Sequence, residues 1–238
     1  MSSIEYLDGI PVNLSNNEVV ALMNDWLTIH QHSRHIITLN AQMVIAAAKF
    51  SCFKEIIKQA DLVTVDGYGV DWALRKRGCP NVQRLVGVDL ARILLQKSCQ
   101  NACPVYFFGG TPRVASELRR VLPLKWPGLI ITDIQDGYGS CSTQTAVFKD
   151  IIRRQPFLLL VGLGTPAQEL FLAGILPYLT ATVGIGVGGA FEVLSGLRRE
   201  APPFIRNHGW EWCFRMLQEP RKINRLPDLA RFWYKYLR

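Results

Sequence analysis

The stretch LVTVDGYGVDWAL, residues 62–74, joins a run of buried-strand character to a segment of helical periodicity. Its first half is apolar and rich in β-branched residues, which favour strands. Asp66 ends this run, and a Gly-Tyr-Gly turn follows before the apolar-periodic segment begins. A strand that passes directly into a helix is the unit from which α/β folds are built. The stretch therefore predicts such a fold and puts a carboxylate where a buried strand gives way to a helix.

The same alternation of strand-like and helical segments extends over most of the chain. Strands are predicted within 35–40, 61–66, 104–110, 129–139, 156–164 and 181–191, and helices at 18–30, 41–59, 87–100, 113–122, 145–154 and 165–176. This order favours a Rossmann-like, mostly parallel sheet with helices on both faces. We expect this α/β core to span residues 1–197.

Composition limits the class of protein. Of the 238 residues, 49% are hydrophobic and 19% charged, which is typical of a folded globular chain. No apolar run approaches the roughly 18–20 residues that span a bilayer. The N-terminus MSSIEYLDGI lacks the basic and apolar regions of a signal peptide. The six cysteines form no CxxC pair, which favours reduced thiols and no metal site. We expect a cytoplasmic protein.

The end of the chain is basic and aromatic. Of the formal net charge of +8, residues 198–238 carry ten Lys or Arg and four Asp or Glu, together with half of the six tryptophans. We predict a helical appendage there that faces an anionic surface, either membrane head groups, nucleic acid or a phosphorylated substrate. The final segment LPDLARFWYKYLR suits an interfacial anchor. The alternative is an aromatic helix packed on its own domain or on a second subunit, in a homo-oligomer.

Glycine follows nearly every predicted strand. Ligands of parallel α/β sheets bind outside the carboxyl ends of the strands, and glycine lets backbone N–H groups approach a ligand closely. The repetition indicates a nucleotide or another phosphorylated ligand, although each glycine alone could simply form a turn. GIGVGGAF (184–191) approaches a dinucleotide-binding motif, but a basic stretch stands where the motif needs an acid. The P-loop pattern is absent.

Eight blocks of the sequence follow the order of one known family. They are TLNAQ (38–42), ADLVTVDGYGV (60–70), RLVGVDL (84–90), FFGGTP (107–112), DGYG (136–139), VGLGTPAQE (161–169), GVGGAFEVLSG (186–196) and EWCFRMLQEPRK (211–222). The chain resembles the WecG/TagA/CpsF glycosyltransferases, glycosyltransferase family 26. The resemblance implies transfer of a sugar, of the N-acetylmannosamine type or a related hexose, from a UDP-sugar to a polyprenyl-diphosphate-linked acceptor. Such enzymes build cell-surface polymers, including teichoic acid and exopolysaccharide, at the inner face of the membrane.

The resemblance also implies roles for three residues at two neighbouring strand exits. Asp66 matches the Asp of the family's D-G motif and is predicted to be the general base of an inverting transfer. The alternative is that Asp66 caps the helix that follows. Thr38 and Asn40 are predicted to lie in the pocket and orient donor or acceptor. For Asn40 the alternative is again a helix cap.

Donor-binding residues come from the later matched blocks. Tyr138, Gln168 and Glu192 are predicted to contact the UDP-sugar, although Glu192 stands where the family pattern has Asp. The Gly-rich exits add the predicted contacts Gly164, Gly188 and Gly189. Resemblance further implies that the C-terminal appendage docks near the cleft, and the arginines predicted to stabilise charge on the diphosphate are Arg215, Arg221 and Arg225. No Asp-x-Asp pair is present, so we expect no metal and no other cofactor.

Two other classes of function remain as alternatives. The same kind of sheet could serve a Rossmann-type NAD(P)-dependent oxidoreductase. A non-enzymatic basic module that binds nucleic acid or membrane is the second alternative. A glycosyltransferase, peripheral on the inner face of the plasma membrane and without a nucleic-acid partner, accounts for both the carboxylate at its strand exit and the basic aromatic tail.

Overall fold

The computed structural model describes residues 4–13, 15–28, 32–202, 204–205, 210–218 and 226–237. The strands are β1 (Ile4–Leu7), β2 (Ile10–Asn13), β3 (Arg34–Leu39), β4 (Leu62–Val65), β5 (Val105–Gly109), β6 (Ile131–Gln135), β7 (Leu158–Gly162) and β8 (Val183–Gly186). The helices are α1 (Asn16–Thr28), α2 (Ala41–Lys49), α3 (Ser51–Lys58), α4 (Tyr68–Lys76), α5 (Gly87–Gln100), α6 (Pro112–Lys125), α7 (Cys141–Arg154), α8 (Ala167–Ile175), α9 (Ala190–Leu194), α11 (Glu211–Gln218) and α12 (Leu226–Leu237), with a 3-10 turn η1 (Leu176–Tyr178).

The strands form one sheet in the order β1-β2-β4-β3-β8-β7-β5-β6. The β1–β2 pair is antiparallel, and the other pairings of described strands are parallel. The predicted α/β class with a mostly parallel sheet is therefore confirmed. The register brings the strand exits level with one another: Leu39 pairs with Val65, and Gly109 pairs with Gly162.

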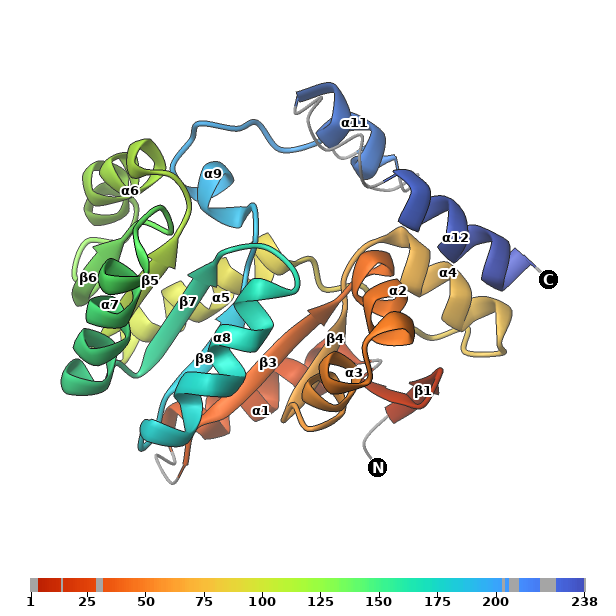
Figure 1. Cartoon of the computed structure of the whole chain (residues 1–238), viewed down its shortest axis with the longest axis horizontal. Helices are drawn as coiled ribbons and strands as arrows, with labels where there is room; N and C mark the ends of the chain where they lie inside the picture. Colours follow the sequence, from red (N-terminus) through yellow and green to blue (C-terminus); the bar gives the residue numbers. More distant parts are fainter. Residues whose placement is uncertain are drawn as a thin grey trace.

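Helices cover both faces of the sheet (Figure 1). On β7, Leu158 and Leu160 belong to the apolar cluster under α1, α5, α6 and α9, whereas Leu159 and Val161 pack with α7 and α8. α2 and α3 cover the remainder of the second face. Because successive side chains of a strand point to opposite faces, burial on both faces produces the unbroken apolar runs of the sequence.

The N-terminal hairpin of β1 and β2 lies outside the predicted strands, which begin at residue 35. Its turn residues, Asp8 and Gly9, both have positive φ (55° and 78°), which is the geometry of the tight turns that suit twisted hairpins. The Asp-Gly dipeptide is the sequence signal for such a turn. Thr64 of β4 pairs with Asn13 of β2, so the hairpin extends the sheet at that edge.

The single helix predicted at 41–59 is wrong, because α2 and α3 are separate helices. Phe50 between them is extended (φ −125°, ψ 106°), ends α2 and begins α3. The change of direction lets Phe53 and Ile57 of α3 bury their side chains in the same cluster as Met43 of α2. No Gly or Pro marks this break in the sequence.

The C-terminal helices lie at the end of the molecule toward which the central strands point (Figure 1). Phe232 and Tyr236 of α12 are buried in the cluster that α2 and α4 also form, while Trp233 is half-buried and Tyr234 exposed. A helical C-terminal segment is therefore confirmed, and two of its aromatic side chains belong to the core. The domain boundary at 197/198 stays a prediction. Among the described helices, none is both long and apolar enough to cross a bilayer.

Candidate active site

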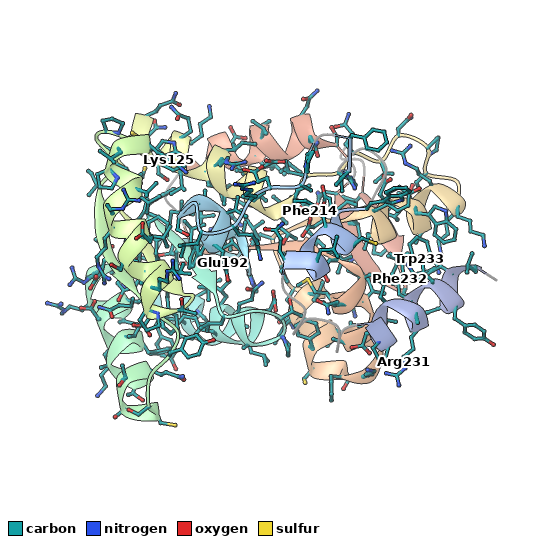
Figure 2. The ribbon with its side chains drawn as sticks, turned by 90° about the horizontal axis from the view of Figure 1, so that it is seen from above. Lys125, Glu192, Phe214, Arg231, Phe232 and Trp233 are labelled. Carbon is teal, nitrogen blue, oxygen red and sulfur yellow. The ribbon has the colours of Figure 1, made fainter. Side chains whose placement is uncertain are left out.

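A cleft of about 720 Å³ opens at the carboxyl ends of the parallel strands. One side consists of the turns that follow β3, β4, β5, β6, β7 and β8. The other side includes Glu211 and Phe214 of α11 and Leu229 and Trp233 of α12. In the view from above, α11 with Phe214 lies between α9 and α12 (Figure 2). The C-terminal helices thus complete a site that begins at the sheet edge.

Asp66 and Thr38 both line this cleft. Asp66 extends β4 by one residue, because its backbone N–H donates to the carbonyl of Leu39 at 2.9 Å. A Cβ added to Gly87 would lie 3.9 Å from Asp66 Oδ2 and 3.5 Å from Thr38 Oγ1, so both side chains approach the start of α5. The N-cap residue of α4 is Gly67, so Asp66 lies one residue before the cap position.

Asn40 both lies in the cleft and caps a helix, the two alternatives predicted for it. It lines the cleft, and its Oδ1 accepts a hydrogen bond at 3.1 Å from the backbone N–H of Met43, which caps α2. The cap occupies the carboxamide oxygen and orients the side chain at the strand exit. The predicted contact between Asn40 and a substrate stays a prediction.

Gln168 connects two of the predicted donor loops. Its Oε1 accepts hydrogen bonds from the backbone N–H groups of Gly164, at 3.2 Å, and Gly188, at 2.9 Å. Its Nε2 donates to Glu169 Oε1 at 2.7 Å. The side chain borders the cleft but is buried, so the structure gives Gln168 a connecting task in addition to the predicted donor contact.

Glu169 is a buried carboxyl group directly behind the cleft. Burial raises the pKa of Glu169 from its ordinary value of 4.5 to about 7, although the hydrogen bond from Gln168 lowers it. The neutral acid is therefore well populated near neutral pH. Sequence reasoning missed this residue, because nothing in the segment TPAQEL distinguishes a buried acid from one on a solvated helical turn.

Close backbone packing shapes the glycine-rich side. A Cβ on Gly109 would lie 2.5 Å from the carbonyl carbon of Gly162, so the exits of β5 and β7 approach as only glycine allows. Gly189 is the N-cap residue of α9, and its carbonyl accepts a hydrogen bond from Arg198 Nη2. The predicted residues Gly164, Gly188 and Gly189 all line the cleft.

Tyr138 and Glu192 occupy the same side of the cleft. Tyr138 is 72% exposed, in a turn where its N–H donates to Asp136 Oδ1 at 2.9 Å. Glu192 projects from α9 (Figure 2). Its Oε2 is buried and has no hydrogen-bond partner among the described residues. Both residues line the cleft, and their predicted contacts with the UDP-sugar stay predictions.

The side chains of the three predicted tail arginines are outside the part of the chain that the structure describes. Arg215 belongs to α11, without a description of its side chain, and Arg221 and Arg225 lie outside the described residues. Arginines that sequence reasoning did not single out do line the cleft, namely Arg198 and Arg199. Their signal in the sequence was the start of the basic segment, directly after the GVGGAFEVLSG block.

The charge that lines the cleft is mixed. Glu200 pairs with Arg92 (Nη1 to Oε2, 3.1 Å), and Glu211 lies 3.9 Å from Arg84. Within the described ranges, no group of three or more His, Cys, Asp or Glu side chains could hold a metal ion. Arg198, Arg199 and backbone N–H groups of the cleft are suited to bind an anionic group.

Comparison with known proteins identifies a family and a similar enzyme. The model of the glycosyl transferase WecG/TagA/CpsF family matches residues 5–238. A protein of Bacillus spizizenii named N-acetylglucosaminyldiphosphoundecaprenol N-acetyl-beta-D-mannosaminyltransferase is 30% identical over 197 residues, which cover 83% of this chain and 76% of that protein.

Proposed function

The chain belongs to the WecG/TagA/CpsF family and is a glycosyltransferase. On that premise we propose that it transfers an N-acetylmannosamine-type sugar or a related hexose, with inversion of the configuration at the anomeric carbon. The proposed donor is a UDP-sugar. The proposed acceptor is a sugar linked through diphosphate to a polyprenyl lipid, in the synthesis of a cell-surface polysaccharide. The name of the Bacillus relative supports both the mannosaminyl group and the lipid-diphosphate acceptor. The family match gives no support to an oxidoreductase or to a non-enzymatic binding module.

The observation that carries the proposal is that one cleft is lined by Asp66 and by two chemically different groups of residues. On the β5–β7–β8 side, the lining is made of glycine-rich turns with Arg198 and Arg199. Tyr68, Leu229 and Trp233 line the other part, near the start of α4 and on α12. The first part suits the diphosphate and ribose of a nucleotide, and the second suits the apolar faces of an acceptor sugar.

The reaction then needs little beyond geometry and charge. The Asp66 carboxylate takes the proton from the acceptor hydroxyl as that oxygen attacks the anomeric carbon of the donor. The bond to UDP breaks on the opposite face, which inverts the configuration. Arg198, Arg199 and the predicted tail arginines would stabilise the negative charge that develops on the leaving diphosphate.

The proposed location is the inner face of the plasma membrane, where both a nucleotide sugar and a lipid-linked acceptor are accessible. Trp210 and Leu217 are 59% and 82% exposed at the C-terminal end of the molecule, close in sequence to Phe214, which lines the cleft. An apolar stripe beside the site would keep the cleft near the lipid head groups. Assembly into a homo-oligomer stays a prediction.

The test is an assay of UDP release with a panel of UDP-sugars and a short-chain lipid-diphosphate N-acetylglucosamine acceptor. We expect release that requires both substrates, with the highest rate for UDP-N-acetylmannosamine among the panel. Binding of NAD(H) without binding of UDP would contradict the proposal. Turnover only with another UDP-hexose would support the proposed reaction and contradict the proposed sugar.

A further inference from the structure

Glu169 is a buried carboxyl group to which the transfer reaction assigns no task. It is 1% exposed and lies on α8, whose first turn borders the cleft through Gln168. One oxygen, Oε1, accepts the 2.7 Å hydrogen bond from Gln168 Nε2. The other, Oε2, is buried without a hydrogen-bond partner among the described residues. Burying a carboxyl group is costly, so its presence behind the site calls for a function.

We propose that Glu169 is a positioning residue for the donor nucleotide, which acts by fixing the orientation of the Gln168 carboxamide. Through that carboxamide, Glu169 holds the exits of β7 and β8 at the spacing that the donor needs. The proposal rests on the proposed function, since it assumes that the glycine-rich exits bind a UDP-sugar.

The hydrogen bonds of the carboxamide have only one workable orientation. Its oxygen accepts from two backbone donors, the N–H groups of Gly164 and Gly188. The two ends of a carboxamide are almost identical in shape, so a 180° flip would set an NH₂ group against these two donors. Glu169 Oε1 opposes that flip, because it accepts a hydrogen bond and therefore needs the NH₂ group of Gln168 to face it. A carboxyl group retains an accepting oxygen in either protonation state.

The carboxamide is also the outer link between the two exits. Backbone pairing of β7 with β8 continues to the bond from Val187 N–H to Val161 O, at 2.8 Å. Beyond that point Gly164 and Gly188 are joined through the side chain of Gln168. Both glycines line the cleft, so a change in this link moves groups that face the ligand.

Tight packing leaves the carboxamide one position. A Cβ built on Gly186 would lie 2.6 Å from Gln168 Nε2 and 2.8 Å from its Cδ. The amide therefore occupies the space that a side chain at Gly186 would need. Substitution of Gly186 by alanine would displace the carboxamide without removing any hydrogen-bonding group, which offers a second way to disturb the same link.

The predicted effect is specific to the donor. Asp66 follows β4, which is separated from β8 by β3. Loss of the Glu169 acceptor should therefore weaken UDP binding and raise the KM for the UDP-sugar, with little change in kcat at saturating donor. A residue that only stabilises the fold would lower the melting temperature without this split between KM and kcat.

The experiment compares wild type, Glu169→Gln, Glu169→Leu and Gly186→Ala by calorimetric titration with UDP and by steady-state kinetics. Glu169→Gln keeps an accepting oxygen and should bind UDP within about threefold of wild type. Glu169→Leu and Gly186→Ala should each weaken UDP binding at least tenfold. The matched control is Gln155→Leu, which removes another loop-tying carboxamide, whose Oε1 accepts from Thr180 N at 2.9 Å and whose Nε2 donates to Tyr178 O at 3.2 Å. This control should lose stability and keep its affinity for UDP.

Each outcome bears on one claim. Wild-type UDP affinity in Glu169→Leu or in Gly186→Ala would overturn the positioning role, and so would a loss in Glu169→Gln as large as in Glu169→Leu. If Glu169→Leu does not fold, Glu169→Gln and Gly186→Ala still decide the question. Absence of UDP binding by the wild-type protein would instead overturn the proposed function.

Discussion

Asp66 and Asn40 hold equivalent places, each one residue beyond a parallel strand, yet the fold uses them differently. Asn40 caps α2 through its carboxamide oxygen, whereas the N-cap of α4 is Gly67, the residue after Asp66. The capping alternative is thus confirmed for Asn40, whereas for Asp66, one residue before the cap position, it stays an alternative. The difference arises because Gly67, at φ 81°, adds one residue between strand and helix. The carboxylate is left lining the cleft.

The first residue-scale prediction concerns the base. Asp66→Asn should lower kcat by roughly 10²–10⁴-fold, because the amide cannot accept the acceptor's proton. The melting temperature and the affinity for UDP should remain near wild type. Asp61→Asn is the matched control at the opposite end of β4, where Asp61 pairs with Arg34 at 2.9 Å. It should lose some stability and keep kcat. Unchanged turnover in Asp66→Asn would refute the assignment.

A second prediction follows from the raised pKa of Glu169. A carboxyl whose pKa rises from 4.5 to about 7 on folding stabilises the protein fully below pH 4.5 and loses that contribution as the pH rises through 7. Glu169→Gln does not titrate. As the pH rises from 5 to 8.5, the free energy of unfolding of wild type should therefore fall by about 2–3 kcal/mol relative to that of Glu169→Gln. Urea unfolding at a series of pH values measures this difference. Parallel pH profiles for the two proteins would contradict it.

At the scale of elements, the agreement between sequence and structure depends on local signals. The bounds of α5 agree with the predicted 87–100, because apolar residues recur at helical spacing over that range. The break at Phe50 carries no such signal and was predicted wrongly. It arises from the way in which α2 and α3 must both bury apolar residues on the β3–β4 part of the sheet.

The docking of α12 is the element-scale prediction. Phe232 is fully buried between α12 and the core, where a Cβ on Gly69 would lie 3.1 Å from its ring. Phe232→Ala should lower the free energy of unfolding by about 3–5 kcal/mol. Tyr234→Ala, on the exposed face of the same helix, should change it by less than about 0.5 kcal/mol. Denaturant unfolding compares the two, and equal effects would argue against this packing.

The hairpin and the C-terminal helix also contact each other. Asp8 in the β1–β2 turn accepts from the Tyr236 hydroxyl at 2.5 Å and pairs with Lys235 and with Arg77 of the segment after α4. Lys76 Nζ donates to the carbonyl of Tyr236 at 2.7 Å, near the end of α12. The N-terminal hairpin and the end of α4 thereby hold α12, and with it Trp233, at the cleft.

At the scale of the whole molecule, the exposed apolar residues of the tail predict membrane association. Trp210→Ser together with Leu217→Ser should weaken binding to anionic vesicles about tenfold or more, since each side chain would otherwise bury apolar surface in lipid. Leu124→Ser is a control on α6, where Leu124 is 73% exposed. Truncation after Gly209 is a less direct test, because it also removes Phe232 and Tyr236 from the core. Equal vesicle sedimentation of wild type, the double variant and Leu124→Ser would contradict the prediction.

Metal independence is also a property of the whole chain. The sequence has no Asp-x-Asp pair, and we propose that arginines and backbone N–H groups balance the diphosphate charge. Turnover should therefore persist in excess EDTA. Abolition of activity by the chelator and its rescue by manganese would show that a cation is required.

The sequence by itself determined the alternation of strands and helices, the glycine-rich exits and the family, because these depend on local periodicity and on short ordered motifs. The tertiary structure alone decided which exits meet, that Gln168 ties Gly164 to Gly188, that Glu169 is buried, and that Phe232 belongs to the core. Those facts depend on strand order and on packing between segments far apart in the chain. A side chain's local sequence carries no record of which distant segment will cover it.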